Sequence, residues 1–181
     1  MRTPSLIPPI SLKSPRAFTL LELLVAVSII VILMGVLFPA ATAAMNSAKK
    51  TTAKNQVVQI ATAITSYETE YGRLPSVTGS NVNAALVSTL CTMTDTNNPR
   101  GIIFLEAGSW KKGKGGTNSL GYCDPFASNS AYSVALDSGY TNSIDVPVSG
   151  TNTTTTNITK HVGVWTVWTN GNTKTLINSW D

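Results

Sequence analysis

Ionisable residues are scarce in this sequence of 181 residues. They make up 12% of the chain, against a usual share of about 25%. Three of the 13 basic residues precede residue 18 (Arg2, Lys13 and Arg16), so residues 18–181 carry 10 basic and 9 acidic side chains, or 10 − 9 = +1. A nucleic-acid-binding protein needs a concentrated basic face, and this composition does not predict one. Ser, Thr and Asn supply 57 of the 181 residues, and such an uncharged polar surface suits an exported protein.

Cysteine and histidine are almost absent, with Cys91, Cys123 and His161 as the complete set. Two cysteines and one histidine do not make a structural zinc site, which needs four such ligands. In an exported domain Cys91 and Cys123 are expected to form a disulfide, whereas a reducing cytosol would leave two free thiols. The disulfide would close a loop of about 33 residues and stabilise the fold by about 3–4 kcal/mol. No nucleophile motif lies near His161, so the chain is not predicted to be an enzyme.

The sequence has one long apolar run, residues 18–38, and Glu22 is its only ionisable side chain. A helix of this length spans roughly 30 Å, the thickness of the hydrocarbon core of a bilayer. One membrane-spanning helix is therefore predicted. A carboxylate near the end of such a span costs a few kcal/mol unless it is paired. If a protease cut between Ala17 and Phe18, the new α-amine of Phe18 would lie one helical turn from Glu22, on this subunit and on any neighbour.

A short basic leader, the small residue Ala17 and the sequence Phe-Thr-Leu-Leu-Glu at residues 18–22 open this apolar helix. The arrangement resembles the processing site of type IV prepilins and type II secretion pseudopilins. The resemblance implies that a prepilin peptidase cuts after Ala17 and methylates the amine of Phe18. It also implies that Glu22 pairs with the amine of a neighbouring subunit during assembly. The family has Gly at the position of Ala17, and Ala is the smallest departure possible.

The resemblance implies a structural function, as a subunit of a type II secretion pseudopilus or a type IV pilus-like filament that polymerises through its N-terminal helix. The implied partners are prepilin peptidase and other pilins or pseudopilins. Lys13 and Arg16 precede the span and place that end in the cytoplasm. The lysines at residues 49–54 lie ten or more residues beyond Pro39 and count less toward orientation. We therefore expect a single-pass protein of the inner membrane, with its head outside the cytoplasm and assembled into a periplasmic or cell-surface filament.

An ordinary secretory signal sequence is the alternative interpretation. Ala41-Thr42-Ala43 fits a small-x-small cleavage site, which would leave Ala44 as the first residue. The length of the apolar run exceeds the usual 7–15 residues of a signal core, and Glu22 lies within it, and both features argue against this alternative. Under it the chain would be a monomeric exported or membrane-anchored binding domain that never polymerises.

The helix is predicted to continue to residue 71. Five apolar residues recur at helical spacing and should pack on a globular head: Val57, Ile60, Ile64, Tyr67 and Tyr71. Gly72 is expected to end the helix and Pro75 to block its continuation. Pro39 is expected to kink or locally unwind it. The predicted segments are a leader (residues 1–17), a membrane and assembly helix (18–39), an amphipathic half-helix (40–71) and a head (72–181).

The head is predicted to add a short helix over residues 81–90, an extended piece or strand over 101–106, and an antiparallel sheet of about three strands. The fold class is therefore α+β. The sheet strands are expected around Val134 and over residues 162–168 and 175–180, with an exposed loop over 151–156. Asn170-Gly171 predicts a two-residue type I′ turn, which would pair Val167 with Lys174.

The loop at residues 108–114 matches most of a phosphate-binding P-loop. Gly108, four residues, Gly113 and Lys114 fit the motif, but Gly115 stands where Ser or Thr is needed. The residues that follow are too rich in turn formers for the helix that the motif requires. A solvated basic loop is the preferred interpretation.

The head resembles the major pseudopilin of type II secretion in three pieces: Gly72-Arg73-Leu74-Pro75, Asp124-Pro125-Phe126, and Val164-Trp165 with Ser179-Trp180. Relatives bind calcium in a loop between the last strands. Residues 170–174 of this chain have no carboxylate, whereas calcium prefers several oxygen ligands including acids. We therefore predict no cofactor. Asp124, Asp137 and Asp145 lie outside that loop and are the remaining, weakly supported candidates for calcium, but they are expected to cap turns instead.

Overall fold

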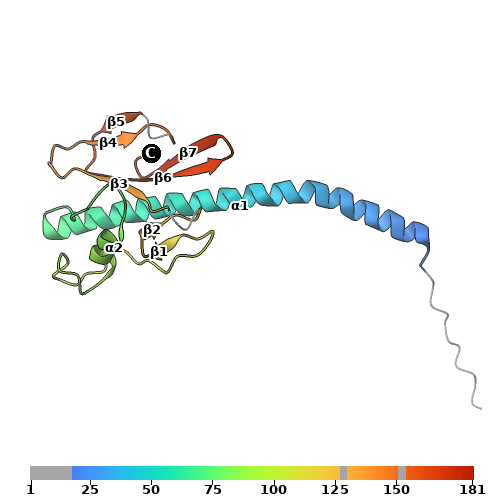
Figure 1. Cartoon of the computed structure of the whole chain (residues 1–181), viewed down its shortest axis with the longest axis horizontal. Coiled ribbons are helices and arrows are strands. Elements are labelled where there is room, and N and C mark those ends of the chain that lie inside the picture. Colours follow the sequence, from blue (N-terminus) through green and yellow to red (C-terminus); the bar gives the residue numbers. More distant parts are fainter. Residues whose placement is uncertain (1–17, 127–129, 151–153) are drawn as a thin grey trace, which may run out of the picture. The chain divides into compact units, whose positions relative to one another are not determined.

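The computed structural model describes residues 18–126, 130–150 and 154–181 (Figure 1). It divides into two compact units, Met1–Ala43 and Ala44–Asp181. Helix α1 (Leu20–Tyr71) begins in the first unit and ends in the second. Pro39 lies inside α1 and the helix continues through it, so the expected local unwinding is wrong, while the kink stays a prediction. Gly72 follows with φ +64°, which confirms it as the residue that ends the helix.

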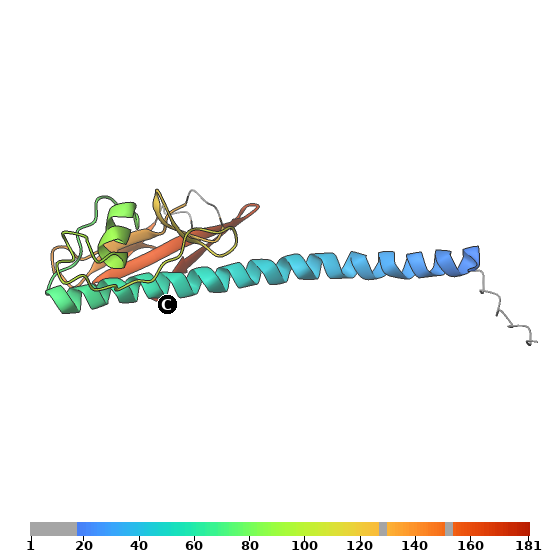
Figure 2. The ribbon, with the colours of Figure 1, turned by 90° about the horizontal axis from the view of Figure 1, so that it is seen from below.

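The second half of α1 supplies the centre of the head's core. Val57, Ile60, Ile64 and Tyr67 are fully buried, and Tyr71 is half-buried. This confirms the predicted apolar stripe. Side chains from three other parts of the head pack in the same cluster, and they include Leu86, Leu90, Tyr132, Val134 and Val164. Figure 2 shows these other elements on one side of this part of α1, which leaves the opposite helix face, with Val58 and Thr62, exposed.

The main sheet has three antiparallel strands in the order β3 (Ser133–Leu136), β6 (Val162–Asn170) and β7 (Thr173–Asn178). This confirms the predicted sheet. Two small antiparallel pairs were not anticipated: β1 (Gly116–Asn118) with β2 (Gly121–Cys123), and β4 (Ile144–Pro147) with β5 (Thr155–Ile158). The predicted loop at 151–156 therefore ends in a strand. Residues 154–156 are exposed as expected, and residues 151–153 lie outside the described part of the chain.

The register of the β6–β7 hairpin differs from the predicted one. Asn170 pairs with Thr173 and Val167 with Leu176, so the two turn residues are Gly171 and Asn172. Gly171 has φ +57°, and Asn172 is not among the described residues with positive φ. A positive φ at the first central residue alone is the pattern of a type II′ turn, which places Gly at that position. The prediction was wrong because it made Gly171 the second turn residue.

Helix α2 (Ala84–Cys91) is the short helix predicted over residues 81–90, with a later start. The side chain of Asn83 accepts a hydrogen bond from Leu86 N at 2.9 Å and caps the helix. The piece over residues 101–106 is extended but is not a strand. Phe104 N and Leu105 N both donate to Leu90 O of α2, at 2.9 and 3.1 Å.

Candidate processing and assembly site

Thr19 and Glu22 form hydrogen bonds with each other at the start of α1. Thr19 N and Thr19 Oγ1 both donate to Glu22 Oε2, at 3.0 and 2.9 Å, and Glu22 N donates to Thr19 Oγ1 at 3.2 Å. This reciprocal arrangement is a capping box, in which the first helical residues satisfy main-chain donors that the helix leaves unpaired. The sequence analysis missed it, although the signal, Thr-x-x-Glu before an apolar run, is present at residues 19–22.

The capping box fixes where the carboxylate of Glu22 lies relative to the chain end. Both bonds to Thr19 use Oε2, and Oε1 makes no hydrogen bond to any residue that the structure describes. Phe18, the predicted first residue of the mature chain, directly precedes Thr19 and is 78% exposed. Ala17 and the leader, residues 1–17, lie outside the described residues. Oε2 of Glu22 therefore orders the first turn, and Oε1 has no partner among the described residues.

No part of the described chain covers the apolar run. Its large side chains between residues 18 and 38 are 47–82% exposed. Among the described helices, α1 is the one that is long and apolar enough to cross a membrane, judged by length and composition. An apolar surface of this extent on a single chain marks a membrane or protein contact. The first unit thus needs lipid, other helices, or both around it.

The two cysteines are free thiols in the structure, in contrast to the predicted disulfide. Cys91 is the last residue of α2, and Cys123 is the last residue of β2. The Cys123 thiol is buried and donates to Asn118 Oδ1 at 3.3 Å within the β1–β2 hairpin. This hydrogen bond turns the sulfur toward its own hairpin. Burial raises the pKa of the Cys91 and Cys123 thiols, which makes both less reactive while the head is folded.

The three acids that were considered for calcium have separate structural roles. Asp124 is buried, accepts a hydrogen bond from Thr166 Oγ1 at 2.6 Å, and accepts another from Phe126 N at 2.9 Å. Asp137 accepts main-chain hydrogen bonds from Thr141 and Asn142. These two therefore cap turns, as expected.

Asp145 differs from the other two because it lies in strand β4. It is exposed and accepts a hydrogen bond from Asn157 Nδ2 at 3.2 Å. Within the described residues, no three side chains of His, Cys, Asp or Glu gather as a metal site would require.

The P-loop-like segment does not lead into a helix. Lys111 and Gly115 exchange main-chain hydrogen bonds of 3.1 and 3.0 Å and close a tight turn. Strand β1 follows directly at Gly116. The lysines at 111, 112 and 114 are exposed, so the solvated basic loop is the better interpretation and a nucleotide site lacks its helix N-terminus.

Asn98 is a structural residue that the sequence analysis overlooked. It is almost fully buried and donates through Nδ2 to the main-chain oxygens of Thr89, Thr92 and Ile102. Its Oδ1 accepts from the hydroxyl of Tyr71 at 2.6 Å. One side chain thereby joins the end of α2, the extended piece and the end of α1. No periodic pattern marks such a residue in a sequence.

Together these observations describe an α+β protein whose head is built on one long N-terminal helix. The beginning of this helix is apolar and exposed, and the carboxylate of Glu22 takes part in the capping box of its first turn. Residues 12–38 match the family of the prokaryotic N-terminal methylation motif. This motif is the signature of type IV pilins and pseudopilins, and it supports a pilin-like precursor of the kind that prepilin peptidase processes. No curated protein and no solved structure matches the chain.

Proposed function

We propose that the chain is a structural subunit of a type II secretion pseudopilus or a type IV pilus-like filament. Prepilin peptidase would cut it before Phe18, and the mature chain would polymerise through the helix that begins there. The observation that carries this proposal is the methylation motif over residues 12–38, placed on an exposed apolar helix that starts with a capped glutamate. Pilin-type subunits act by assembly, so no enzymatic activity is part of the proposal.

Glu22 would select the neighbouring subunit. The carboxylate is costly in an apolar phase when it is unpaired, and the amine of a processed Phe18 is costly there for the same reason. Their pairing between two subunits offsets both costs only when the helices meet. Thr19 occupies Oε2, so Oε1 is the oxygen that we assign to the neighbour's amine. Pro39, which has no N–H to donate, is proposed as the point where the helix kinks in the assembled filament.

The membrane topology follows the distribution of charge around the span. Lys13 and Arg16 precede it, and basic residues at the start of a span stay in the cytoplasm. The second unit, Ala44–Asp181, would then lie outside the cytoplasm. We propose a single-pass location in the inner membrane before assembly.

Contacts at the end of the chain support a pseudopilin-like head. Val164 N donates to Ser179 Oγ at 3.0 Å, and Ser179 N donates to Val164 O at 2.9 Å. The rings of Trp165 and Trp180 meet edge to face with centroids 5.9 Å apart. The two dipeptides through which the sequence resembles the major pseudopilin thus form one closing contact of the sheet. On this ground we favour the secretion pseudopilus over the pilus.

A monomeric exported domain with an ordinary signal sequence is the second candidate. One observation favours it: the boundary between the two compact units falls after Ala43, where a small-x-small cleavage site also ends. A signal sequence would pass the same test of length and composition as α1.

Intact mass and N-terminal sequencing of the chain from its native membrane separate the two candidates. We expect Phe18 as the first residue, carrying one added methyl group, and we expect the chain in filaments sheared from cells that express the secretion machinery. A chain that begins at Ala44 would establish the signal sequence and end the proposal. Correct processing without any filament would retain the precursor assignment and contradict the structural function.

A further inference from the structure

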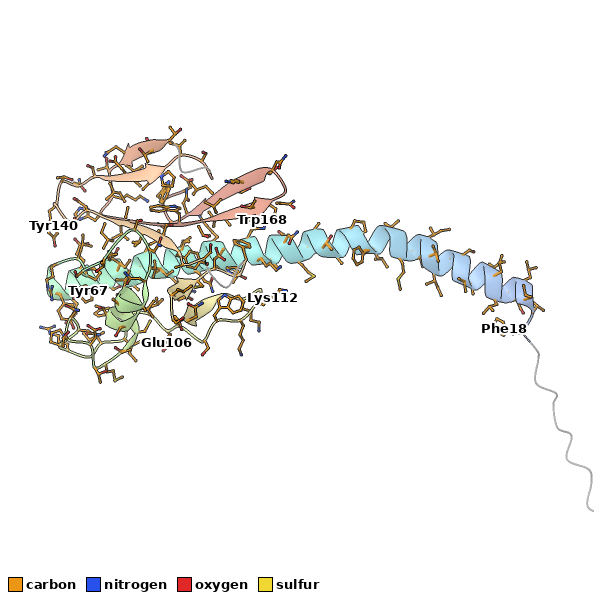
Figure 3. All side chains as sticks on the ribbon, viewed as in Figure 1. Phe18, Tyr67, Glu106, Lys112, Tyr140 and Trp168 are labelled. Carbon is orange, nitrogen blue, oxygen red and sulfur yellow. The ribbon has the colours of Figure 1, made fainter. Side chains whose placement is uncertain are left out.

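Six lysines gather at one end of the head, and we call them the lysine cluster: Lys49, Lys50, Lys54, Lys111, Lys112 and Lys114. Two observations bring the loop at 111–114 against α1. A Cβ built on Gly113 would lie 3.7 Å from Lys49 Cε, and Gln56 Nε2 donates to Lys114 O at 2.7 Å. Six of the 10 basic residues after the leader thus share one small region. Figure 3 shows Lys112 and Trp168 toward this end of the head and Tyr140 at the other.

The positive charge of the lysine cluster is not neutralised by the head. The ion pairs among the described residues join Arg100 to Glu70 and His161 to Glu68, and neither involves a lysine. Lys54 donates to two main-chain oxygens, of Asn178 and Asp181, at 3.0 and 2.7 Å. The side chains of the other five form no hydrogen bond within the described part of the chain. A concentration of unpaired positive charge attracts an anionic surface.

Aromatic side chains lie among these lysines. The ammonium of Lys50 lies 3.7 Å from the ring centre of Trp168, and the ring of Phe126 is 6.5 Å from that of Trp168. Trp110 directly precedes Lys111 and donates from Nε1 to Asp124 O at 3.1 Å. Tryptophan and lysine together are typical of protein surfaces at a membrane–water interface, where the ring lies at the level of the headgroups and the charge meets phosphate.

The chain keeps this region close to the end of the proposed span. Lys49 follows Phe38 by only eleven residues, and a helical segment of that length is roughly 16 Å long. The headgroup layer adds roughly 5–8 Å to the hydrocarbon core on each side, and electrostatic attraction extends about 8 Å beyond it at physiological salt. A tether this short also keeps the local concentration of the surface high.

We propose that the lysine cluster docks the head on the anionic phospholipid surface of the membrane that anchors the chain. The lipid phosphates are the ligand, and Trp168 and Trp110 flank the lysines at headgroup level. The inference rests on the proposed function in one respect, that residues 18–38 cross a membrane. Docking would hold the unassembled subunit against the bilayer, and assembly would have to release it.

A second copy of the chain is the competing occupant, because its acids could face these lysines. The acids of the head are less suited to that role. Glu70 and Glu68 are already paired, and Asp95 and Asp137 accept hydrogen bonds from nearby main-chain N–H groups. Asp124 is buried, and Asp145 and Asp181 accept hydrogen bonds from Asn157 and Asn178. Among the acids of the described head, Glu106 alone is exposed without a hydrogen bond or ion pair, and one acid does not match six lysines. Lipid phosphates have no competing intramolecular partner, so the observations favour the membrane.

Tryptophan fluorescence of the full chain in vesicles tests the docking, because all four tryptophans lie after residue 44 and none lies in the span. The vesicles consist of phosphatidylcholine with or without phosphatidylglycerol, and each contains a lipid with a nitroxide quencher on its headgroup. We expect stronger quenching in the anionic vesicles. High salt should remove the difference, because the screening length falls to about 3 Å at 1 M.

The decisive variant replaces Lys49, Lys111 and Lys112 with Gln, since none of these side chains has a hydrogen-bond partner among the described residues. Each lysine at an anionic surface is worth about fivefold in binding. The triple variant should therefore reduce the ratio of docked to undocked heads by up to roughly a hundredfold. The control replaces Arg73, Arg100 and Lys160 with Gln, which makes the same change in net charge, and it should retain the quenching. Vesicle flotation and circular dichroism verify insertion and fold.

Three outcomes would overturn the proposal. Equal quenching in both kinds of vesicle would show that the anionic lipid is not bound. Equal loss in the two triple variants would show a general charge effect. A lysine-dependent signal that appears only at high protein density would assign the cluster to a second copy of the chain. Each result is obtained from inserted protein without filaments, so it is independent of whether the chain polymerises.

Discussion

Glu22 has two separable roles, and substitutions at residues 19 and 22 distinguish them. Its carboxylate accepts two hydrogen bonds from Thr19 in the capping box, and we propose that its charge pairs with a neighbour's amine. Glu22→Gln keeps an oxygen acceptor for Thr19 and removes the charge. Thr19→Ala removes the hydroxyl of the capping box and keeps the charge. Glu22→Ala removes both the acceptor and the charge.

The expected effects differ in size and in place. Loss of an N-terminal Thr cap costs about 1 kcal/mol, confined to the first turn. Gln also serves in a capping box, so Glu22→Gln costs the cap little, apart from the 0.3–1 kcal/mol or so of the charge on the helix dipole. A charge pair at about 4 Å is worth about 4 kcal/mol at an effective dielectric constant of 20. If about a third of this energy remains after the cost of desolvation, the pair changes the equilibrium constant of each subunit contact by a factor of about ten.

The assay compares sheared filaments with membrane-bound subunits at equal total protein, and intact mass verifies that each variant is cleaved and methylated. We expect Glu22→Gln and Glu22→Ala to reduce filaments by about tenfold or more while the head stays folded and inserted. Thr19→Ala should retain most of them. Loss of filaments in Thr19→Ala together with normal filaments in Glu22→Gln would show that the cap alone explains Glu22. Normal filaments in both Glu22 variants would remove the main physical support for polymerisation through this residue.

Three further predictions concern the head, studied in detergent with its anchor intact. Ile60→Ala should lower the free energy of unfolding by about 2–5 kcal/mol because the side chain is fully buried. Val58→Ala, on the exposed helix face, should change it by less than about 0.5 kcal/mol. Equal effects of the two variants in denaturant titrations would contradict the packing of this face of α1 in the core. An alkylating reagent should label Cys91 and Cys123 slowly in folded protein, since burial raises the pKa of both thiols, and it should label both fully after denaturation without reductant. If neither cysteine is labelled after denaturation, the two form a disulfide. A main-chain hydrogen bond lowers the pKa of Asp95. The ionised carboxylate therefore stabilises the head fully above about pH 4, and this stabilisation disappears as the pH falls through the lowered pKa of the folded protein. Asp95→Asn should destabilise the head at pH 7 but not in strong acid, and a difference in stability that does not depend on pH would refute this.

Most of the fold features that could be predicted from the sequence came from periodic patterns of apolar residues. The spacing of Val57, Ile60, Ile64 and Tyr67 is a local property of one helix, and Gly72 is a local signal for its end. The structure therefore confirms both the buried stripe and the end of the helix. The strand around Val134 was found for the same reason, because alternation needs no knowledge of its partner.

The features that were missed depend on contacts between distant residues or on turn geometry. Strands β1, β2, β4 and β5 have three or four residues each, which is too short for a clear alternation. Strands β1 and β5 consist mostly of Gly, Thr and Asn, and β4 ends in Pro147, which weakens a strand prediction. The register of β6 and β7 depends on which turn position Gly171 occupies. Asn98 has its role only because α2 and the end of α1 meet around it.

The capping box also bears on the choice between the two processing routes. Either cut leaves the same head, because the first buried core residue of α1, Ala53, follows both Ala17 and Ala43. A cut after Ala43 would discard Thr19 and Glu22, whereas a cut after Ala17 keeps them directly behind the new amine. Two hydrogen bonds from Thr19 then hold the carboxylate at a defined depth.

A carboxylate held in this way can pair with a neighbour's amine only when the two helices are in register, so the cap should govern filament order more than filament number. We therefore expect Thr19→Ala filaments, which keep the charge but loosen its position, to show weaker helical order in electron micrographs at near-normal yield. Filaments of unchanged order would show that Glu22 sets the register without its cap.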